Sequence, residues 1–131
     1  EPSRRQRQMC IRDRNYLAYS WLERNYKIEL SMEMLKEAYD LRKNDPYITD
    51  SLGWGYYLIN DFENAEKYLK KAVELMPYDP IVNDHYGDIL WMLNRKIQAR
   101  YFWNNVLNLD ETDDEMKIDV KKKIIYGIEK T

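Results

Sequence analysis

The chain repeats itself with a period of 34 residues between Asp45 and Asp110. Shifting the sequence by 34 positions places identical residues on each other at Asp45, Pro46, Asp50, Gly53, Asn60, Ala65 and Leu75. Self-similarity at this period is typical of arrays in which every repeat is a pair of antiparallel helices. One such pair cannot bury its apolar face alone, so neighbouring pairs must stack on each other. The sequence therefore predicts an all-α fold, an α-solenoid of about three helix–turn–helix repeats.

Helix boundaries and helix contacts can both be predicted inside the repeat. Asp45-Pro46 and Asp79-Pro80 predict helix starts, because aspartate accepts free amide hydrogens at the N-cap and proline suits the next position. We expect helices at 46–59, 63–76, 80–93 and 96–109. Small residues mark the points where the two helices of a pair must approach closely: Gly53, Ala65, Ala72, Gly87 and Ala99.

The two repeats resemble the tetratricopeptide repeat (TPR) family. The first repeat carries the family's spacing in Leu52-Gly53, Tyr56, Ala65, Leu69, Ala72 and Pro77. The second carries it in Tyr86-Gly87, Leu90, Ala99, Trp103 and Val106, with Glu111 in place of the closing proline. The resemblance implies a right-handed superhelix whose concave face binds an extended peptide or a helix of a partner protein. Most of the chain from Asn15 to Leu109 also resembles the C-terminal repeats of long proteobacterial TPR proteins, some of which are outer-membrane lipoprotein adaptors.

Four structural units follow from this pattern. Residues 15–45 form a degenerate first repeat, 46–79 the second repeat, 80–111 the third, and 112–131 a capping helix. In the first repeat, Ser31 is expected to cap or begin the second helix. The inward face of that helix is expected to contain Met34, Leu35, Ala38 and Leu41. In the capping helix, Thr112 is the expected N-cap. Its expected apolar face contains Met116, Val120, Ile124 and Ile128.

The first 14 residues differ in composition from the rest of the chain. They hold five of the nine arginines, against four in the remaining 117 residues. The run Arg4–Arg14 resembles the translation of a common sequencing-library adapter, so we expect residues 1–14 to be a non-native scar, disordered or arbitrary in structure. The natural chain would then be a fragment of a longer gene product. The alternative is a basic arm that binds nucleic acid or a membrane surface.

The charge balance gives no indication of nucleic-acid binding. The chain has 21 basic and 23 acidic side chains, and removing residues 1–14 leaves 16 and 21. What remains is mildly acidic and has no basic patch for a phosphate backbone. No apolar run reaches the ~18 residues that a membrane span needs. Cysteine is absent after Cys10, which fits a periplasmic, outer-membrane-associated or cytoplasmic location in a bacterium and leaves the compartment open.

A catalytic, metal or cofactor site is not expected. His85 is the only histidine, and Asp84 and Asp88 lie on either side of it. A histidine and an aspartate three residues apart on a helix can hold a metal ion or act as an acid–base couple. This pair has no third ligand, and the four glycines form no phosphate-binding pattern. We therefore predict that His85 lines a groove or lies on the surface, and that the protein is not an enzyme.

The concave face can be located from the phase of the first helix in each repeat. With Gly53 and Gly87 pointing inward, the predicted partner-binding residues are Tyr47, Asp50, Trp54, Tyr57, Asp84, His85, Asp88 and Trp91, with Ser51, Leu58, Ile81 and Met92 beside them. Aromatic side chains are frequent binding anchors. The carboxylates favour a basic ligand and repel a carboxylate ligand. The alternative assigns Trp54 and Trp91 to packing between repeats, and Asp50 and Asp84 to the helix dipole.

Two classes of function fit these observations best. The first is a non-enzymatic scaffold or adaptor that binds a partner peptide or helix, basic or anchored by an aromatic side chain, on its concave face. The alternative is a helical docking appendage of a larger enzyme whose catalytic domain lies upstream. A third, weaker hypothesis is self-association through the N-terminal repeat face, which a truncated array would leave exposed.

Overall fold

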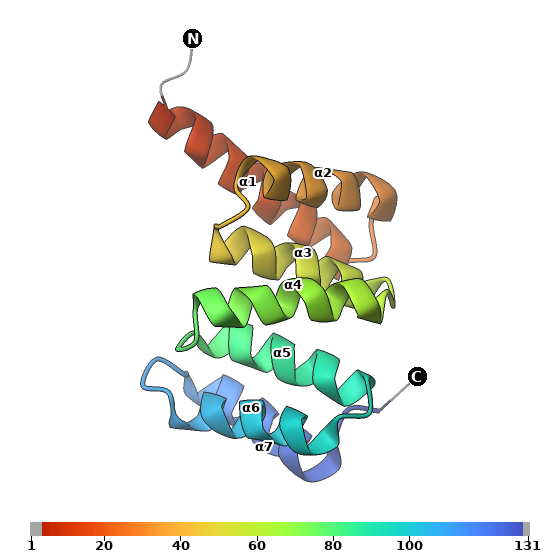
Figure 1. Cartoon of the computed structure of the whole chain (residues 1–131), viewed down its shortest axis with the longest axis vertical. Helices are drawn as coiled ribbons and strands as arrows, with labels where there is room; N and C mark the ends of the chain where they lie inside the picture. The colour runs from red at the N-terminus through yellow and green to blue at the C-terminus, as the bar shows by residue number, and fades with distance from the viewer. Residues whose placement is uncertain (1–3, 130–131) are drawn as a thin grey trace.

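The computed structural model describes the backbone of residues 4–129 and the side chains from Ile11 onward. Over this range the chain forms seven α-helices and no strand, stacked in sequence order from α1 to α7 (Figure 1). The helices are α1 (Arg4–Glu23), α2 (Ile28–Leu41), α3 (Pro46–Leu58), α4 (Phe62–Leu75), α5 (Pro80–Met92), α6 (Lys96–Asn108) and α7 (Asp114–Tyr126). The fold is therefore an all-α helical repeat solenoid, as predicted.

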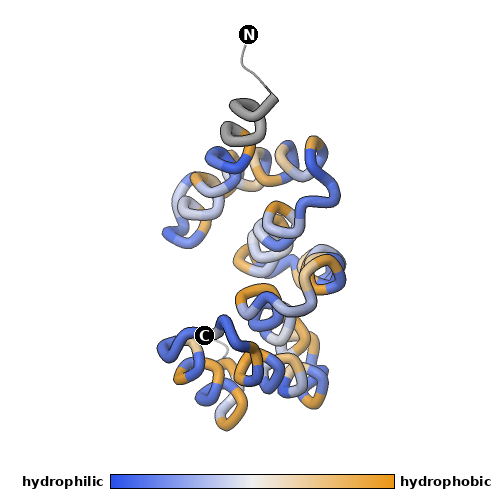
Figure 2. The backbone as a smooth tube through the Cα atoms, turned by 90° about the vertical axis from the view of Figure 1, so that its left-hand side faces the viewer, coloured by the Kyte–Doolittle hydropathy of each residue, from blue (hydrophilic) through white to orange (hydrophobic). Residues whose placement is uncertain are grey.

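Three helix pairs and one final helix build the array. α1 packs on α2, α3 on α4, α5 on α6, and α7 on α6. The pairs are joined through α2–α3 and α4–α5 contacts, and α3 also contacts both α1 and α5. The first helices of the three pairs, α1, α3 and α5, therefore lie next to one another along one face. Hydrophobic and hydrophilic residues alternate along the helices in Figure 2, as expected for helices that bury one side.

The predicted helix starts are confirmed. The Asp45 carboxylate accepts hydrogen bonds from the backbone N–H groups of Tyr47 and Ile48, and the Asp79 carboxylate accepts one from Val82. Asn60 and Asn94, at the predicted turns, have positive φ angles of 65°. Asparagine tolerates this left-handed conformation better than most side chains, so it ends one helix and allows the next to begin.

Gly53 and Gly87 lie where the two helices of a pair touch. A Cβ atom on Gly53 would lie 2.7 Å from Cγ of Leu69 and 2.9 Å from the backbone nitrogen of Leu69. A Cβ atom on Gly87 would lie 2.5 Å from the ring of Trp103, which is fully buried. The three alanines expected at close contacts are also fully buried: Ala65, Ala72 and Ala99. Small residues at these positions allow the two helices of each pair to approach closely.

Several predicted details of the first repeat are wrong. α2 begins at Ile28 after Lys27, which has a positive φ angle, so Ser31 lies inside the helix and is fully buried. Met34, Leu35 and Ala38 face inward as expected, but Leu41 is 62% exposed because it is the last residue of the helix. A serine hydroxyl suits the N-cap position, but tertiary packing overrides this preference and places Ser31 inside the helix.

The start and end of the last helix also differ from the prediction. Asp113, not Thr112, is the N-cap of α7, and its carboxylate accepts a hydrogen bond from the backbone N–H of Met116. Thr112 instead donates its hydroxyl hydrogen to the Val106 carbonyl at 2.6 Å and so ties the loop to α6. α7 ends at Tyr126, before Gly127. The predicted apolar face is present: Val120 is fully buried, and Met116, Ile124 and Ile128 pack against the core.

α1 begins well before the first repeat. It starts at Arg4, so residues 4–14 are helical and run directly into the helix expected from Asn15. Arg12 forms an ion pair with Asp45 and Arg14 forms one with Glu37, at 3.4 and 3.5 Å. Residues 1–3 of the predicted scar lie outside the described residues, and the origin of the segment remains a prediction. Among the residues described, no helix combines the length and apolar character needed to cross a membrane.

Candidate functional site

A pocket of about 430 Å³ lies on the face formed by α1, α3 and α5. Its lining residues come from all three helices: Arg12, Asn15, Tyr16, Tyr19, Tyr47, Ile48, Asp50, Ser51, Ile81 and His85. Three apolar or aromatic side chains on this face are largely exposed, Tyr16 at 72%, Tyr47 at 54% and Ile81 at 52%. Each comes from a different first helix, so the pocket bridges the three repeats.

The Asp50–His85 pair lies at this pocket. Nδ1 of His85 is 3.0 Å from both carboxylate oxygens of Asp50, and both side chains are buried, with 9% and 10% of their surface exposed. Burial opposes a charge on His85, but the Asp50 carboxylate and its hydrogen bond outweigh this, and the pKa of His85 is raised. The imidazole is therefore held towards its protonated form, as the positive half of a buried ion pair.

Two aromatic rings hold the imidazole in place. The Trp54 ring stacks on His85 with centroids 3.9 Å apart and an interplanar angle of 13°. The Tyr57 ring stacks on Trp54 at 4.4 Å and 9°. This arrangement fixes the orientation of His85, because a ring packed in this way cannot rotate without disturbing its neighbours.

A second charge cluster, in which Asp88 is buried and the other members are partly buried, joins α5 to α7. Nζ of Lys123 lies 2.6 Å from Asp84 and 2.8 Å from Asp88, and the Trp103 indole donates a hydrogen bond to Asp88 at 3.1 Å. We call Lys123, Asp84 and Asp88 the lysine cluster. Burial and the neighbouring Asp84 charge raise the pKa of Asp88 to about 6, although Lys123 acts in the opposite direction. The two carboxylates expected to attract a basic ligand are thus bound to a lysine of the same chain.

Side chains at equivalent positions of α1, α3 and α5 each form a polar contact with the next helix along this face. That next helix is α3 for α1, α5 for α3, and α7 for α5. Asn15 Nδ2 donates to Ser51 Oγ on α3 at 3.0 Å, Asp50 pairs with His85 on α5, and Asp84 pairs with Lys123 on α7. In the sequence, Asn15 precedes Asp50 by 35 residues and Asp50 precedes Asp84 by 34. These side chains form a polar ladder that links the repeats.

The structure divides the predicted partner-binding residues into three groups. Tyr47, Asp50 and His85 line the pocket, and Trp54 and Tyr57 stack beside it. Asp84 and Asp88 belong to the lysine cluster. Trp91 lies apart from the pocket, since its indole donates to the Ile128 carbonyl at 3.3 Å. The sequence did not predict that α1 contributes to the pocket, through Arg12, Asn15, Tyr16 and Tyr19. Aligning Leu17-Ala18 with Leu52-Gly53 would have placed these residues on the same face.

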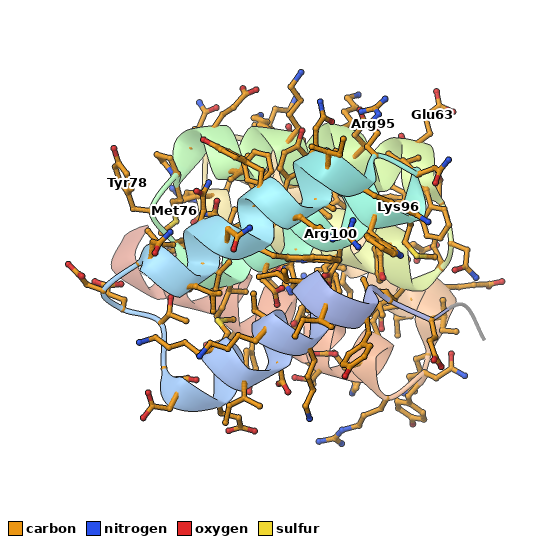
Figure 3. All side chains as sticks on the ribbon, turned by 90° about the horizontal axis from the view of Figure 1, so that it is seen from below. Glu63, Met76, Tyr78, Arg95, Lys96 and Arg100 are labelled. Atoms are coloured by element: carbon orange, nitrogen blue, oxygen red, sulfur yellow. The ribbon has the colours of Figure 1, made fainter. Side chains whose placement is uncertain are left out.

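Two basic side chains lie over the Trp91 ring. Lys96 and Arg100 each place their cationic groups 5.0 Å from the centre of the Trp91 ring, and Arg100 Nε donates to the Ile124 carbonyl. Figure 3 shows this end of the molecule, with Arg95 and Lys96 on one side, Arg100 nearer the middle, and Met76 and Tyr78 at the opposite edge. Trp91 therefore secures the junction between α5, α6 and α7.

A larger hollow of about 540 Å³ lies between two loops, residues 75–79 and 108–111. Its lining comes from these loops and adjoining helix ends, and it shares no residue with the α1/α3/α5 pocket. Within the described part of the chain, no three histidine, cysteine or acidic side chains converge closely enough to hold a metal ion. The pocket between the first helices combines exposed aromatic surface with a fixed polar pair, which suits the capture of a side chain from a partner.

Three solved structures share this fold. The first TPR of Spaghetti (RPAP3), bound to the HSP90 peptide SRMEEVD, is 16% identical with a TM-score of 0.72, covering 86% of this chain and 88% of that one. The Yersinia enterocolitica type III secretion translocator chaperone SycD is 14% identical with a TM-score of 0.75, covering 88% and 89%. MamA MSR-1 C2 is 19% identical with a TM-score of 0.70, covering 89% and 64%.

These similarities concern the fold. No protein-family model matches the sequence, and no curated protein matches it. At 14–19% identity, the solved structures establish a TPR-type helical solenoid and leave the ligand of this chain to be argued from its own residues.

Proposed function

We propose that this chain is a non-enzymatic protein-interaction module that binds a peptide or helix of a partner protein on the face formed by α1, α3 and α5. The observation that carries the proposal is the pocket of about 430 Å³ with Tyr16, Tyr47 and Ile81 exposed on three adjacent helices. Apolar surface of this kind is more stable when covered, and large aromatic side chains contribute much of the energy in protein interfaces.

Two similar structures support the proposal at the level of architecture. The RPAP3 TPR is bound to a peptide, and SycD is a translocator chaperone, so the same fold serves protein binding in other proteins. The chain has 21 basic and 23 acidic side chains, a balance that favours a protein ligand over nucleic acid. Within this proposal, a role as an adaptor in a bacterial cell follows from the resemblance to proteobacterial TPR proteins.

Selection from a random peptide library displayed on phage tests the proposal. The full chain is used as bait, and the dissociation constants of selected peptides are measured by fluorescence anisotropy. We expect Tyr47→Ala and Ile81→Ala each to weaken binding by at least about tenfold, because truncating a central binding anchor costs about 2 kcal/mol or more. The binding surface is then the α1/α3/α5 face.

Tyr101→Ala is the matched control. Tyr101 is 63% exposed, a degree similar to Tyr47, but it lies on α6, a second helix of a pair. This variant should bind every selected peptide with the affinity of the unmodified chain. Equal affinities for all three variants, or a loss confined to Tyr101→Ala, would contradict the proposed face. Circular dichroism of each variant shows whether a loss of binding comes from a loss of helix.

A further inference from the structure

Every charged side chain that lines the pocket has an oppositely charged partner in the chain. The charged lining residues are Arg12, Asp50 and His85. Asp50 and His85 pair with each other at 3.0 Å, and Arg12 pairs with Asp45 at 3.4 Å. The rest of the lining is aromatic, aliphatic or neutral and polar. A ligand in the pocket would therefore contact apolar side chains and charges that are already paired. It would find no carboxylate free to form an ion pair with it.

The other charges around His85 are also paired. Apart from Asp50 on α3, the charged groups that act on His85 are Asp84 and Asp88 on its own helix α5. Both of these carboxylates bind Lys123 from α7, within 2.8 Å. Removing the charge of His85 would therefore leave Asp50 as the carboxylate at the pocket without a cationic partner.

We infer that His85 determines the ligand specificity of the pocket by neutralising Asp50, so that the pocket accepts an uncharged apolar side chain from a partner protein and rejects a basic one. This inference rests on the proposed function and specifies its ligand. It reverses the sequence-based expectation of a basic ligand, which treated Asp50 as a free negative charge.

The physical reason lies in the cost of burying a charge. A lysine side chain that enters the pocket must lose water around its ammonium group, and this costs free energy unless a carboxylate is free to pair with it. Asp50 is already occupied, and the protonated imidazole would repel the ammonium group. A side chain of the same length without a charge loses no such hydration, and gains contact with Tyr16, Tyr47 and Ile81.

A matched pair of synthetic peptides tests the inference. A selected peptide whose binding depends on Tyr47 is made with either norleucine or lysine at its anchoring position, since these side chains have similar length and differ in charge. The full chain should prefer norleucine by at least about tenfold, or about 1.4 kcal/mol, because burying an unpaired charge costs free energy. Affinity for the norleucine peptide should change little with salt, because no ion pair forms across the interface.

Two variants then test whether His85 sets this preference. His85→Gln leaves the charge of Asp50 without its cation, and the preference should shift towards lysine by at least about tenfold. The double variant Asp50→Asn/His85→Gln has no charge at this position and should prefer norleucine again. Circular dichroism and thermal denaturation establish that each variant is folded at the measuring temperature.

A pH series on the unmodified chain provides a test without substitution. Raising the pH from about 6 through the raised pKa of His85 removes its proton, so the preference should move towards lysine as long as the lysine remains charged. Asp50→Asn should not show this movement. The inference is overturned if the unmodified chain prefers lysine, or if His85→Gln and the pH change both leave the preference within about twofold. Peptides whose binding does not depend on Tyr47 would instead overturn the proposed function itself.

Discussion

Asp50 and Asp84 occupy the same position in successive repeats, yet their surroundings differ. Asp50 pairs with the rigid imidazole of His85 and lines a pocket of about 430 Å³. Asp84 shares the ammonium group of Lys123 with Asp88, and the Trp103 indole donates a hydrogen bond to Asp88. The difference lies in the partner that the neighbouring helix supplies. α5 supplies the His85 imidazole to Asp50, and α7 supplies the longer and more flexible Lys123 side chain to Asp84.

This comparison indicates where a ligand can be accommodated. The lysine cluster satisfies its own carboxylates and leaves no acidic group available to a partner at the α5/α7 end. The α1/α3/α5 end has a satisfied ion pair but keeps Tyr16, Tyr47 and Ile81 exposed. One end of the face is thus closed by the chain itself, and the other is open to a partner.

Lys123→Met should have the largest effect on stability. It leaves the buried Asp88 and the partly buried Asp84 side by side without a cation, and removing one member of a buried ion pair costs about 3–5 kcal/mol. The free energy of unfolding, measured by urea denaturation at neutral pH, should fall by about this amount. Lys123 lowers the pKa of Asp88, which is about 6 in the unmodified chain, so in the variant this pKa lies higher. Protonation of Asp88 then relieves the unpaired charge, and the deficit should shrink as the pH falls towards about 6.

Lys122→Met is the control for that substitution. Lys122 lies next to Lys123 on α7 but is exposed and has no ion pair among the described residues. Its replacement should change the free energy of unfolding by less than about 0.5 kcal/mol. If the two variants were equally stable, the lysine cluster would have no part in holding α7 to the array.

His85→Gln should have a smaller effect, about 2 kcal/mol near pH 6. It leaves one buried carboxylate without its cation, not two adjacent ones, and the glutamine amide can still donate a hydrogen bond. The pKa of His85 is raised in the folded state, so the stability that it contributes is complete below about 6.5 and is lost as the pH rises through the folded-state pKa. The difference between the two proteins should therefore shrink at higher pH. Urea denaturation at about pH 6 and 9 would reveal any difference that grows with pH instead.

Much of the fold could be predicted from the sequence because the repeat signals are local. The aspartate caps at Asp45 and Asp79 need only the amide groups of the next turn, and Asn60 and Asn94 need only their own backbone conformation. The helix boundaries in the second and third repeats were therefore correct to within about one residue, well inside the usual error of such predictions. Ser31 was misjudged because its position depends on packing between α1 and α2, which leaves no local signal.

The site could be predicted only in part. Helical phase correctly placed Tyr47, Asp50 and His85 on one face, because one face of a helix follows from residue spacing. The partners of Asp50 and Asp84 lie 35 and 39 residues further along the chain, on different helices. No periodicity shows that a lysine of α7 reaches back to α5, so residue spacing alone could not show that Asp84 and Asp88 form an ion pair within the chain.

Asp79→Ala should cost about 1 kcal/mol, the usual contribution of a helix N-cap. Asp79 accepts one backbone hydrogen bond at the start of α5, the helix that carries Asp84 and also His85, the partner of Asp50. Asp79→Asn should retain most of this stability, because an amide oxygen also accepts the hydrogen bond. Thermal denaturation of the two variants separates them. An equal loss in both would indicate that the charge of Asp79, not its hydrogen bond, stabilises the helix start.

Arg12→Gln should have the smallest effect, less than about 0.5 kcal/mol. The Arg12 side chain is 66% exposed, and exposed ion pairs contribute little because water and salt screen them. Asp45 keeps its two backbone hydrogen bonds when Arg12 is replaced, so α3 should still begin at Pro46. Urea denaturation measures this difference, with Lys122→Met as a reference for an exposed cation elsewhere. A loss above about 1 kcal/mol would mean that the arginine-rich start of α1 is an integral part of the open end of the face, in conflict with its interpretation as a foreign segment.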